Sequence, residues 1–94
     1  MRWSISLRAD GDRPMEREEI VELADAVARW QGIASGIGTT SYSAQIVIEA
    51  PTSDEAVELA MRAFEEAAAL AGLPPWPVAW AESVGDEEEL EELL

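Results

Sequence analysis

The chain lacks the three residue types that most often carry nucleophilic or acid–base chemistry, because its 94 residues contain no His, no Cys and no Lys. Catalysis would have to use carboxylates, Ser, Arg or the single Tyr42, and no serine elbow or catalytic pair of carboxylates stands out. A working acid or base would then be a buried carboxyl with a shifted pKa, which a sequence does not reveal. The sequence therefore predicts no catalytic residue. It leaves the question of catalysis undecided but favours a protein that is not an enzyme.

Two acidic stretches contain residue types that bind cations. Residues 10–12, Asp-Gly-Asp, resemble the start of a calcium-binding loop, but the remaining ligands and the Glu at the twelfth position are missing. Residues 87–92, EEELEE, attract divalent cations only diffusely, since nothing in them fixes a coordination geometry. Without Cys there is no thiolate site and no disulfide framework. We therefore predict no metal site and no cofactor.

The charge of the chain is strongly and unevenly negative. Twenty acidic residues against six Arg give a net charge of −14, and residues 63–94 hold nine acids and no base. Self-repulsion opposes binding to phosphate backbones and anionic membranes, so we predict no nucleic-acid or membrane partner and favour a partner with a basic surface. The first ten residues have no apolar signal core and no apolar run approaches the length of a membrane span, so we expect a cytoplasmic protein.

The alternation of apolar and polar residues predicts four strands, and the helical spacing of apolar residues predicts two helices. In chain order they are a strand over 2–9, a helix over 14–31, a weaker Gly-interrupted strand over 33–40, a strand over 41–51, a helix from Thr52 to Gly72 and a strand over 77–84. Thr52 and Glu55 match a capping box, and Pro14 suits the first turn of the earlier helix. Residues 74–77, Pro-Pro-Trp-Pro, are interpreted as a rigid connector.

The apolar stripes of the two predicted helices contain a short repeat. Val-Glu-Leu-Ala occurs at 21–24 and again at 57–60, in the same part of each helix. The expected core-facing residues are Ile20, Leu23, Ala24, Val27 and Trp30 in the first helix, and Ala56, Leu59, Ala60, Ala63, Phe64, Ala67 and Leu70 in the second.

The order strand–helix–strand–strand–helix–strand resembles the ferredoxin-like split βαβ sandwich (βαββαβ) over about residues 2–84. This α+β fold has a four-stranded antiparallel sheet with two helices on one face, and its first and third strands are central. We expect one domain over 1–84, followed by an acidic C-terminal helix or tail over 85–94. The resemblance is to a fold rather than to a named family, and this fold has many functions.

One face of such a sheet is not covered by helices, and its central positions are unusual for a chain this acidic. Small or uncharged residues dominate them, which suits the close approach of another surface. Arg2 is expected near Glu49, since the two central strands are antiparallel. The predicted interaction face consists of Arg2, Ser4, Ser6, Arg8, Ser43, Gln45, Val47 and Glu49.

The RNA-recognition motif shares this order of elements, but it stacks bases on aromatic side chains of the same two central strands. Here Trp3 and Tyr42 fall on the helix-facing side, and the exposed positions are Ser and Gln. This arrangement and the net negative charge argue against RNA binding.

Two further groups of residues are candidates for contact with a partner. Trp76 and Trp80 share strand parity with Val78, so all three should point the same way: inward as core, or outward as anchors beside the serine-rich face. Leu90, Leu93 and Leu94 lie on one side of a short acidic helix that would dock on its own domain or on a partner, or else belong to a solubilising tail.

These observations favour a small, acidic, non-enzymatic interaction module that associates through its open sheet face. The partner would be a second copy, giving a homodimer, or a larger protein with a basic surface, or both. The alternative is a small-molecule-binding domain or cofactor-free enzyme similar to the dimeric α+β-barrel proteins or the ACT domains. Such domains bind ligands between protomers or near a turn like residues 9–14, where Gly11 lies.

Overall fold

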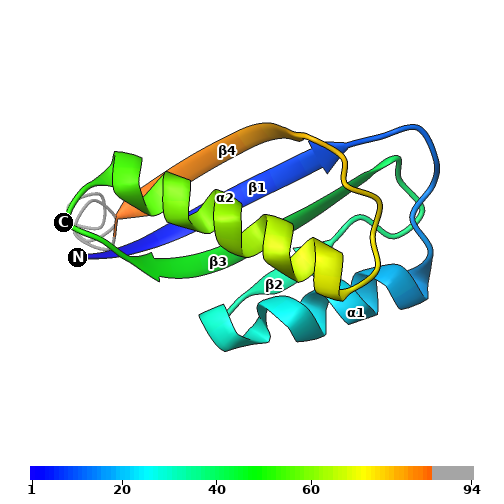
Figure 1. The fold of residues 1–94 in the computed structure, drawn as a ribbon, viewed down its shortest axis with the longest axis horizontal. Coiled ribbons are helices and arrows are strands. Elements are labelled where there is room, and N and C mark those ends of the chain that lie inside the picture. Colours follow the sequence, from blue (N-terminus) through cyan, green and yellow to red (C-terminus); the bar gives the residue numbers. More distant parts are fainter. Residues whose placement is uncertain (86–94) are drawn as a thin grey trace, which may run out of the picture.

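The computed structural model describes residues 1–85, which form an α+β domain with a four-stranded antiparallel sheet and two α-helices (Figure 1). This confirms the predicted class and the order of the elements. In chain order they are β1 (Arg2–Asp10), α1 (Arg17–Val27), the 3₁₀-helix η1 (Ala28–Trp30), β2 (Ile33–Ser35), β3 (Ser41–Glu49), α2 (Ser53–Leu70) and β4 (Val78–Gly85).

The sheet has the strand order β2-β3-β1-β4, with β3 and β1 at its centre. All three neighbouring pairs are antiparallel. β1 and β3 pair over nine residues each, from Arg2 opposite Glu49 to Asp10 opposite Ser41, so the expected register of the central strands is confirmed. Because the register fixes which side chains share a face, it also fixes the composition of both faces of the sheet.

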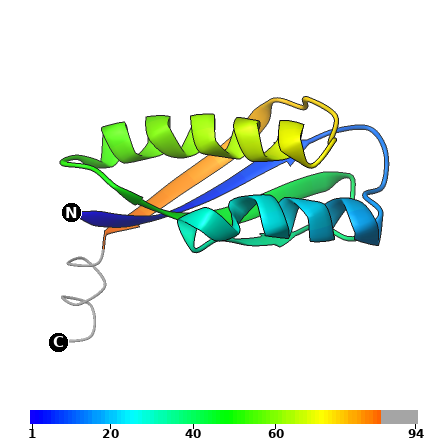
Figure 2. The ribbon, with the colours of Figure 1, turned by 60° about the horizontal axis from the view of Figure 1, so that its bottom comes forward.

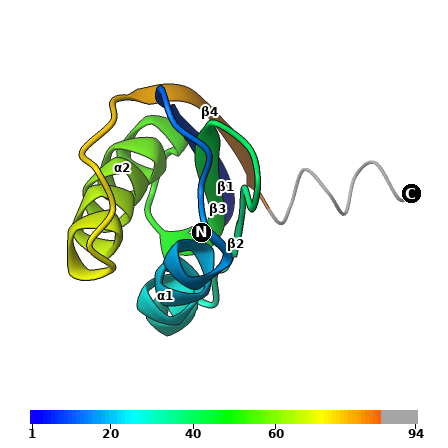
Figure 3. The ribbon, with the colours of Figure 1, turned by 90° about the vertical axis from the view of Figure 1, so that its right-hand side faces the viewer.

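Both helices lie on the same side of the sheet and run in opposite directions beside each other (Figures 2 and 3). Helix α2 packs on β1, β3 and β4, whereas α1 packs on β2 and β3. We call the side under the helices the covered face and the other side the open face. Sheets that bury one face and expose the other show the alternation of apolar and polar residues that β1 and β3 have here.

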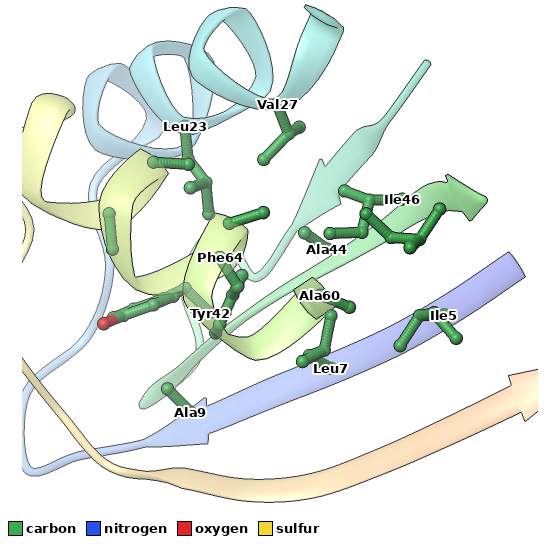
Figure 4. Close-up of a cluster of buried hydrophobic side chains, with 14 of the residues drawn as sticks. Ile5, Leu7, Ala9, Leu23, Val27, Tyr42, Ala44, Ile46, Ala60 and Phe64 are labelled. Carbon is green, nitrogen blue, oxygen red and sulfur yellow. The ribbon is translucent and has the colours of Figure 1, made fainter. Parts of the chain in front are cut away.

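The hydrophobic core lies between the covered face and the helices (Figure 4). Alternate residues of β1 and β3 are buried in it, as predicted, and the Nε1–H of Trp3 donates a hydrogen bond of 3.0 Å to the Ala50 carbonyl. Among residues 1–85 no buried side chain is charged or polar in type. The strand residues of the core are Trp3, Ile5, Leu7 and Ala9 on β1, and Tyr42, Ala44, Ile46 and Ile48 on β3.

Helix α1 begins at Arg17, three residues later than the sequence suggests. Met15 is buried and extended, and its backbone pairs with the segment after β2: its N–H donates to Thr39 and its carbonyl accepts from Gly38. The helix can start only after this pairing ends, and it then uses Glu16 as its N-cap in a reciprocal capping box with Glu19.

Helix α2 keeps its predicted ends but not its predicted buried stripe. The Thr52 side chain accepts a hydrogen bond from the Glu55 N–H at 3.3 Å, and Gly72 (φ 74°) follows the C-terminus in the left-handed conformation. Leu59 and Leu70, however, are exposed, so their assignment to the core is wrong. The helix packs through Phe64 and its alanines instead, which lets its backbone approach the sheet closely.

The repeated Val-Glu-Leu-Ala therefore has different roles in the two helices. Leu23 is fully buried in α1, whereas Leu59, at the equivalent place in the repeat, is exposed in α2. The repeat has no common packing role. Strand β2 is also shorter than predicted, because Gly36 (φ 130°) turns the chain against the Ser41 carbonyl, where a Cβ would clash.

Candidate functional site

The open face consists of the outward side chains of all four strands, and the register arranges them in rows across the sheet. One row runs from Ser35 and Ser43 to Arg8 and Trp80, and the next from Ile33 and Gln45 to Ser6 and Glu82. Ser4 lies between Val47 and Val84 in a third row, and Arg2 is opposite Glu49 in the last. The eight predicted face residues thus share one surface. The same rows also contain Ile33, Ser35, Glu82 and Val84, which the sequence did not predict for this face.

A shallow hollow of about 230 Å³ lies near the middle of the open face. Small and polar residues of the central strands form its floor, while Trp80 and Ile33 stand on the outer strands at its two sides. Trp80 is 44% exposed and Ile33 is 65% exposed. The Oγ atoms of Ser35 and Ser43 are 2.6 Å apart, so these two hydroxyls are hydrogen-bonded along one wall. The open face therefore combines a recess with two exposed apolar side chains.

Trp76 and Trp80 point to opposite sides of the sheet, which corrects the prediction that they share an orientation with Val78. The pairing of β4 with β1 is irregular: Arg8 is opposite Trp80, but the next residue, Ala9, is opposite Val78. Ala79 is therefore an extra residue, and such a bulge reverses the parity of the strand. Val78 lies on the covered side with Ala9, and Trp80 lies on the open side with Arg8.

Trp76 belongs to the covered side and is part of the structural support of the domain. Its ring stacks on Tyr42 with centroids 5.6 Å apart and lies against Gly11, where a Cβ would overlap the ring. The Arg13 guanidinium is 5.9 Å from the same ring. This packing explains Gly11 without a ligand at the turn. Trp76 is thus removed from the candidate anchors, and Trp80 remains.

Tyr42 holds the connector before β4 in place. Its hydroxyl donates a hydrogen bond of 2.8 Å to the Pro74 carbonyl. Burial raises the pKa of the Tyr42 phenol above its ordinary value, with a smaller contribution from the negative charge of Glu65. The phenol therefore stays protonated at neutral pH and acts as a hydrogen-bond donor to the connector.

Charge is distributed very unevenly between the two sides of the molecule. The open face carries Arg2 and Arg8 against Glu49, Glu82 and Asp10, and Arg8 and Asp10 form an ion pair of 2.9 Å. The two helices on the other side carry nine acids and two Arg. The open face is therefore nearly neutral, and most of the negative charge of the described residues lies away from it.

The acidic turn after β1 has no metal-site geometry, since among residues 1–85 no group of three or more acidic side chains could hold an ion. No helix in this part of the chain is long and apolar enough to cross a membrane. The candidate docking residues Leu90, Leu93 and Leu94, with the predicted C-terminal helix or tail, lie outside the described residues. Comparison with protein-family models, curated proteins and solved structures found no match to this chain.

Proposed function

We propose that this domain is a non-enzymatic protein–protein interaction module that binds its partner through the open face. The partner we favour is a second copy of the same chain. A larger protein, docking with or instead of that copy, is the other candidate, and a cytoplasmic location is part of the proposal. The observation that carries it is the hollow flanked by Trp80 and Ile33 on the nearly neutral side of a very acidic molecule.

We propose in addition that the topology is ferredoxin-like. The two strands that precede the helices, β1 and β3, are the central pair, and β2 and β4 flank them at the edges. Both helices pack on one face. In this arrangement the open face is the largest surface of the sheet that no element of residues 1–85 covers.

Electrostatics favours the second copy over other partners for this face. Two molecules that each carry a charge of −14 repel one another, and for the charges of residues 1–85 the repulsion is smallest when the acidic helices point apart. Contact between two open faces achieves this, and a two-fold axis would let the Trp80 of each copy enter the hollow of the other. A strongly basic partner would instead prefer the helices, where the acids are concentrated.

The test measures sedimentation velocity over a range of protein concentrations for the native chain and a double variant, Ser6→Arg with Gln45→Arg. Both substitutions place bulky charges in the hollow, so we expect a native dimer and a monomeric variant. The matched control, Val21→Arg with Leu59→Arg, adds the same charge on exposed positions of the two helices and should leave the dimer intact. A native monomer at every concentration would contradict the second copy as partner, and equal association of both variants would contradict the face.

The alternative of a small-molecule-binding domain or cofactor-free enzyme of the dimeric α+β-barrel or ACT type stays a prediction. The features that favour it are the topology and Gly11 in the turn after β1, and the packing of the Trp76 ring accounts for the glycine. A thermal-shift screen of metabolites on the native chain tests it, because a ligand that binds the folded state raises the unfolding temperature.

A further inference from the structure

A second cavity, on the covered side of the sheet, is independent of the open face. It has a volume of about 260 Å³ and lies between α2 and the proline-rich connector that leads into β4. Tyr42, Phe64 and Trp76 supply aromatic walls, and Leu73 and Val78 add aliphatic surface. A cavity of about 150 Å³ with such a lining is large enough to hold benzene, so this one has room for a ring with a short substituent.

The sequence holds this cavity open in two ways. Helix α2 presents Ala68 and Ala69 to it, where longer side chains would fill the space. The opposite wall cannot easily collapse inward, because three of residues 74–77 are proline and the Tyr42 hydroxyl anchors the first of them. Such preformed apolar pockets with few polar groups are the usual form of small-molecule sites.

The single charged residue of the lining is Glu65, on the exposed side of α2. Its neighbour Glu66 pairs with Arg29 at 2.8 Å, and Glu58 pairs with Arg62 at 3.2 Å. Within residues 1–85, by contrast, Glu65 has no ion pair or hydrogen-bond partner for its carboxylate. The nearby Arg13, over the Trp76 ring, is held by both carboxylate oxygens of Glu19 at 2.8 and 2.6 Å.

We propose that this cavity binds a small organic cation with a flat apolar body, of the class of the arylalkylamines. The ring would occupy the aromatic cavity, and the ammonium group would lie at the mouth beside Glu65. The net charge of −14 favours the approach of cations and opposes that of carboxylates. The proposal does not depend on the interaction module, because none of the lining residues lies on the open face.

The test uses 2-phenylethylamine, its uncharged counterpart 2-phenylethanol and the anion 3-phenylpropanoate, each titrated into the native chain and followed by amide chemical shifts. We expect shifts at Ala68 and Val78, with the amine binding about two- to fivefold more tightly than the alcohol, the range of an exposed ion pair. The anion should bind most weakly. If none of the three probes shifts these amides up to its solubility limit, the proposal is wrong.

One substitution tests where the ligand binds, and a second tests which residue gives the preference for a cation. Ala68→Leu fills the cavity and should abolish binding of all three probes. The control Ala28→Leu, at an exposed position of η1, should leave binding unchanged. If Ala68→Leu does not fold, Ala69→Leu at the mouth of the cavity takes its place. Glu65→Gln should remove the preference for the amine over the alcohol, and Glu22→Gln on α1 should keep it. Unchanged binding in the filled variant would overturn the location, and an unchanged preference in Glu65→Gln would overturn the class of ligand.

Discussion

The two faces of the sheet are built from alternate residues of the same strands, yet they differ in what their side chains do. On the covered face, Leu7 is fully buried beneath the helices, and Ile46 and Tyr42 are buried on the neighbouring strand. On the open face, Ser6 and Ser43 are partly exposed and make up the floor of a shallow hollow. The covered face is occupied by this chain's own helices, whereas the open face has small residues in its middle and exposed apolar ones at its sides.

Because of this difference, we expect the covered face to determine the stability of the monomer and the open face to determine its association. Burial of large apolar side chains supplies most of the free energy of folding, so the covered face should determine the stability of the monomer. Serines on a solvated strand surface add little to it. If the open face is an interface, its residues should affect association and leave the unfolding of the monomer nearly unchanged.

The largest expected effect compares neighbouring residues of β1. Leu7→Ala removes three buried carbons and leaves a cavity, so we expect it to lower the free energy of unfolding by about 2–5 kcal/mol. Ser6→Ala changes a partly exposed side chain on the other face and should stay within about 0.5 kcal/mol. Urea denaturation at a concentration where the protein is monomeric measures both. Equal losses for the two variants would show that the faces do not differ as described.

The second comparison concerns the two tryptophans on either side of the bulge. Trp76→Ala removes the ring that packs on Tyr42 and Gly11 and should destabilise the monomer by about 2 kcal/mol or more. Trp80→Ala removes an exposed ring, so monomer stability should change by less than about 1 kcal/mol while dimerisation weakens severalfold. The two readouts are thermal unfolding and sedimentation. A Trp80 variant that unfolds as easily as the Trp76 variant would place that ring in the core.

The orientations of Trp76 and Trp80 also show what the sequence alone does not predict. Strict alternation in β1 and β3 correctly predicted both faces of the central strands, because a period of two residues needs no knowledge of the neighbouring strands. The orientation of Trp80 depends on the extra residue Ala79, and a bulge is a property of the pairing with β1. Nothing local to residues 76–80 marks it, so the main anchor candidate of the open face could be named but not oriented.

In the helices, too, the differences from the prediction come from tertiary packing. Leu59 has the helical spacing of a core residue, but α2 turns its alanines toward the sheet and leaves this leucine exposed. Hydrophobic character alone does not show which side of an alanine-rich helix allows the closest packing. The start of α1 was misplaced for a tertiary reason as well, since the pairing of Met15 with the segment after β2 delays it. Ile33 and Trp80, on the two outer strands beside the hollow, share the open face only because of how the strands pair in the sheet.

A smaller effect is expected from hydrogen bonds on the two faces, and β3 offers adjacent residues. Tyr42→Phe removes the buried donor to the Pro74 carbonyl and should cost about 0.5–1.5 kcal/mol, because that carbonyl loses its partner. Ser43→Ala removes an exposed hydrogen bond to Ser35, which water can replace, so its cost should be lower. Chemical denaturation of both variants measures the difference. A greater loss in Ser43→Ala would contradict the structural role of the Tyr42 hydroxyl.

The smallest effect concerns a charge on the helix side. The Glu19 carboxylate accepts hydrogen bonds from Arg13 and from the Glu16 N–H, which lower its pKa from 4.5 to about 2. A carboxyl with a lowered pKa in the folded state stabilises the fold above its unfolded pKa and loses this contribution as the pH falls toward its folded pKa.

Glu19→Gln should therefore be less stable than the native chain near neutral pH, and the difference should disappear between about pH 4.5 and pH 2. Glu18→Gln makes the same charge change one residue away, at a carboxylate that is not the partner of Arg13, so it should lower stability near neutral pH less than Glu19→Gln does. Because Arg13 is reached by water, salt should weaken the effect, and melting curves from pH 2 to pH 7 with and without added salt test it. An equal pH profile for both variants would mean that the ion pair with Arg13 does not contribute to stability.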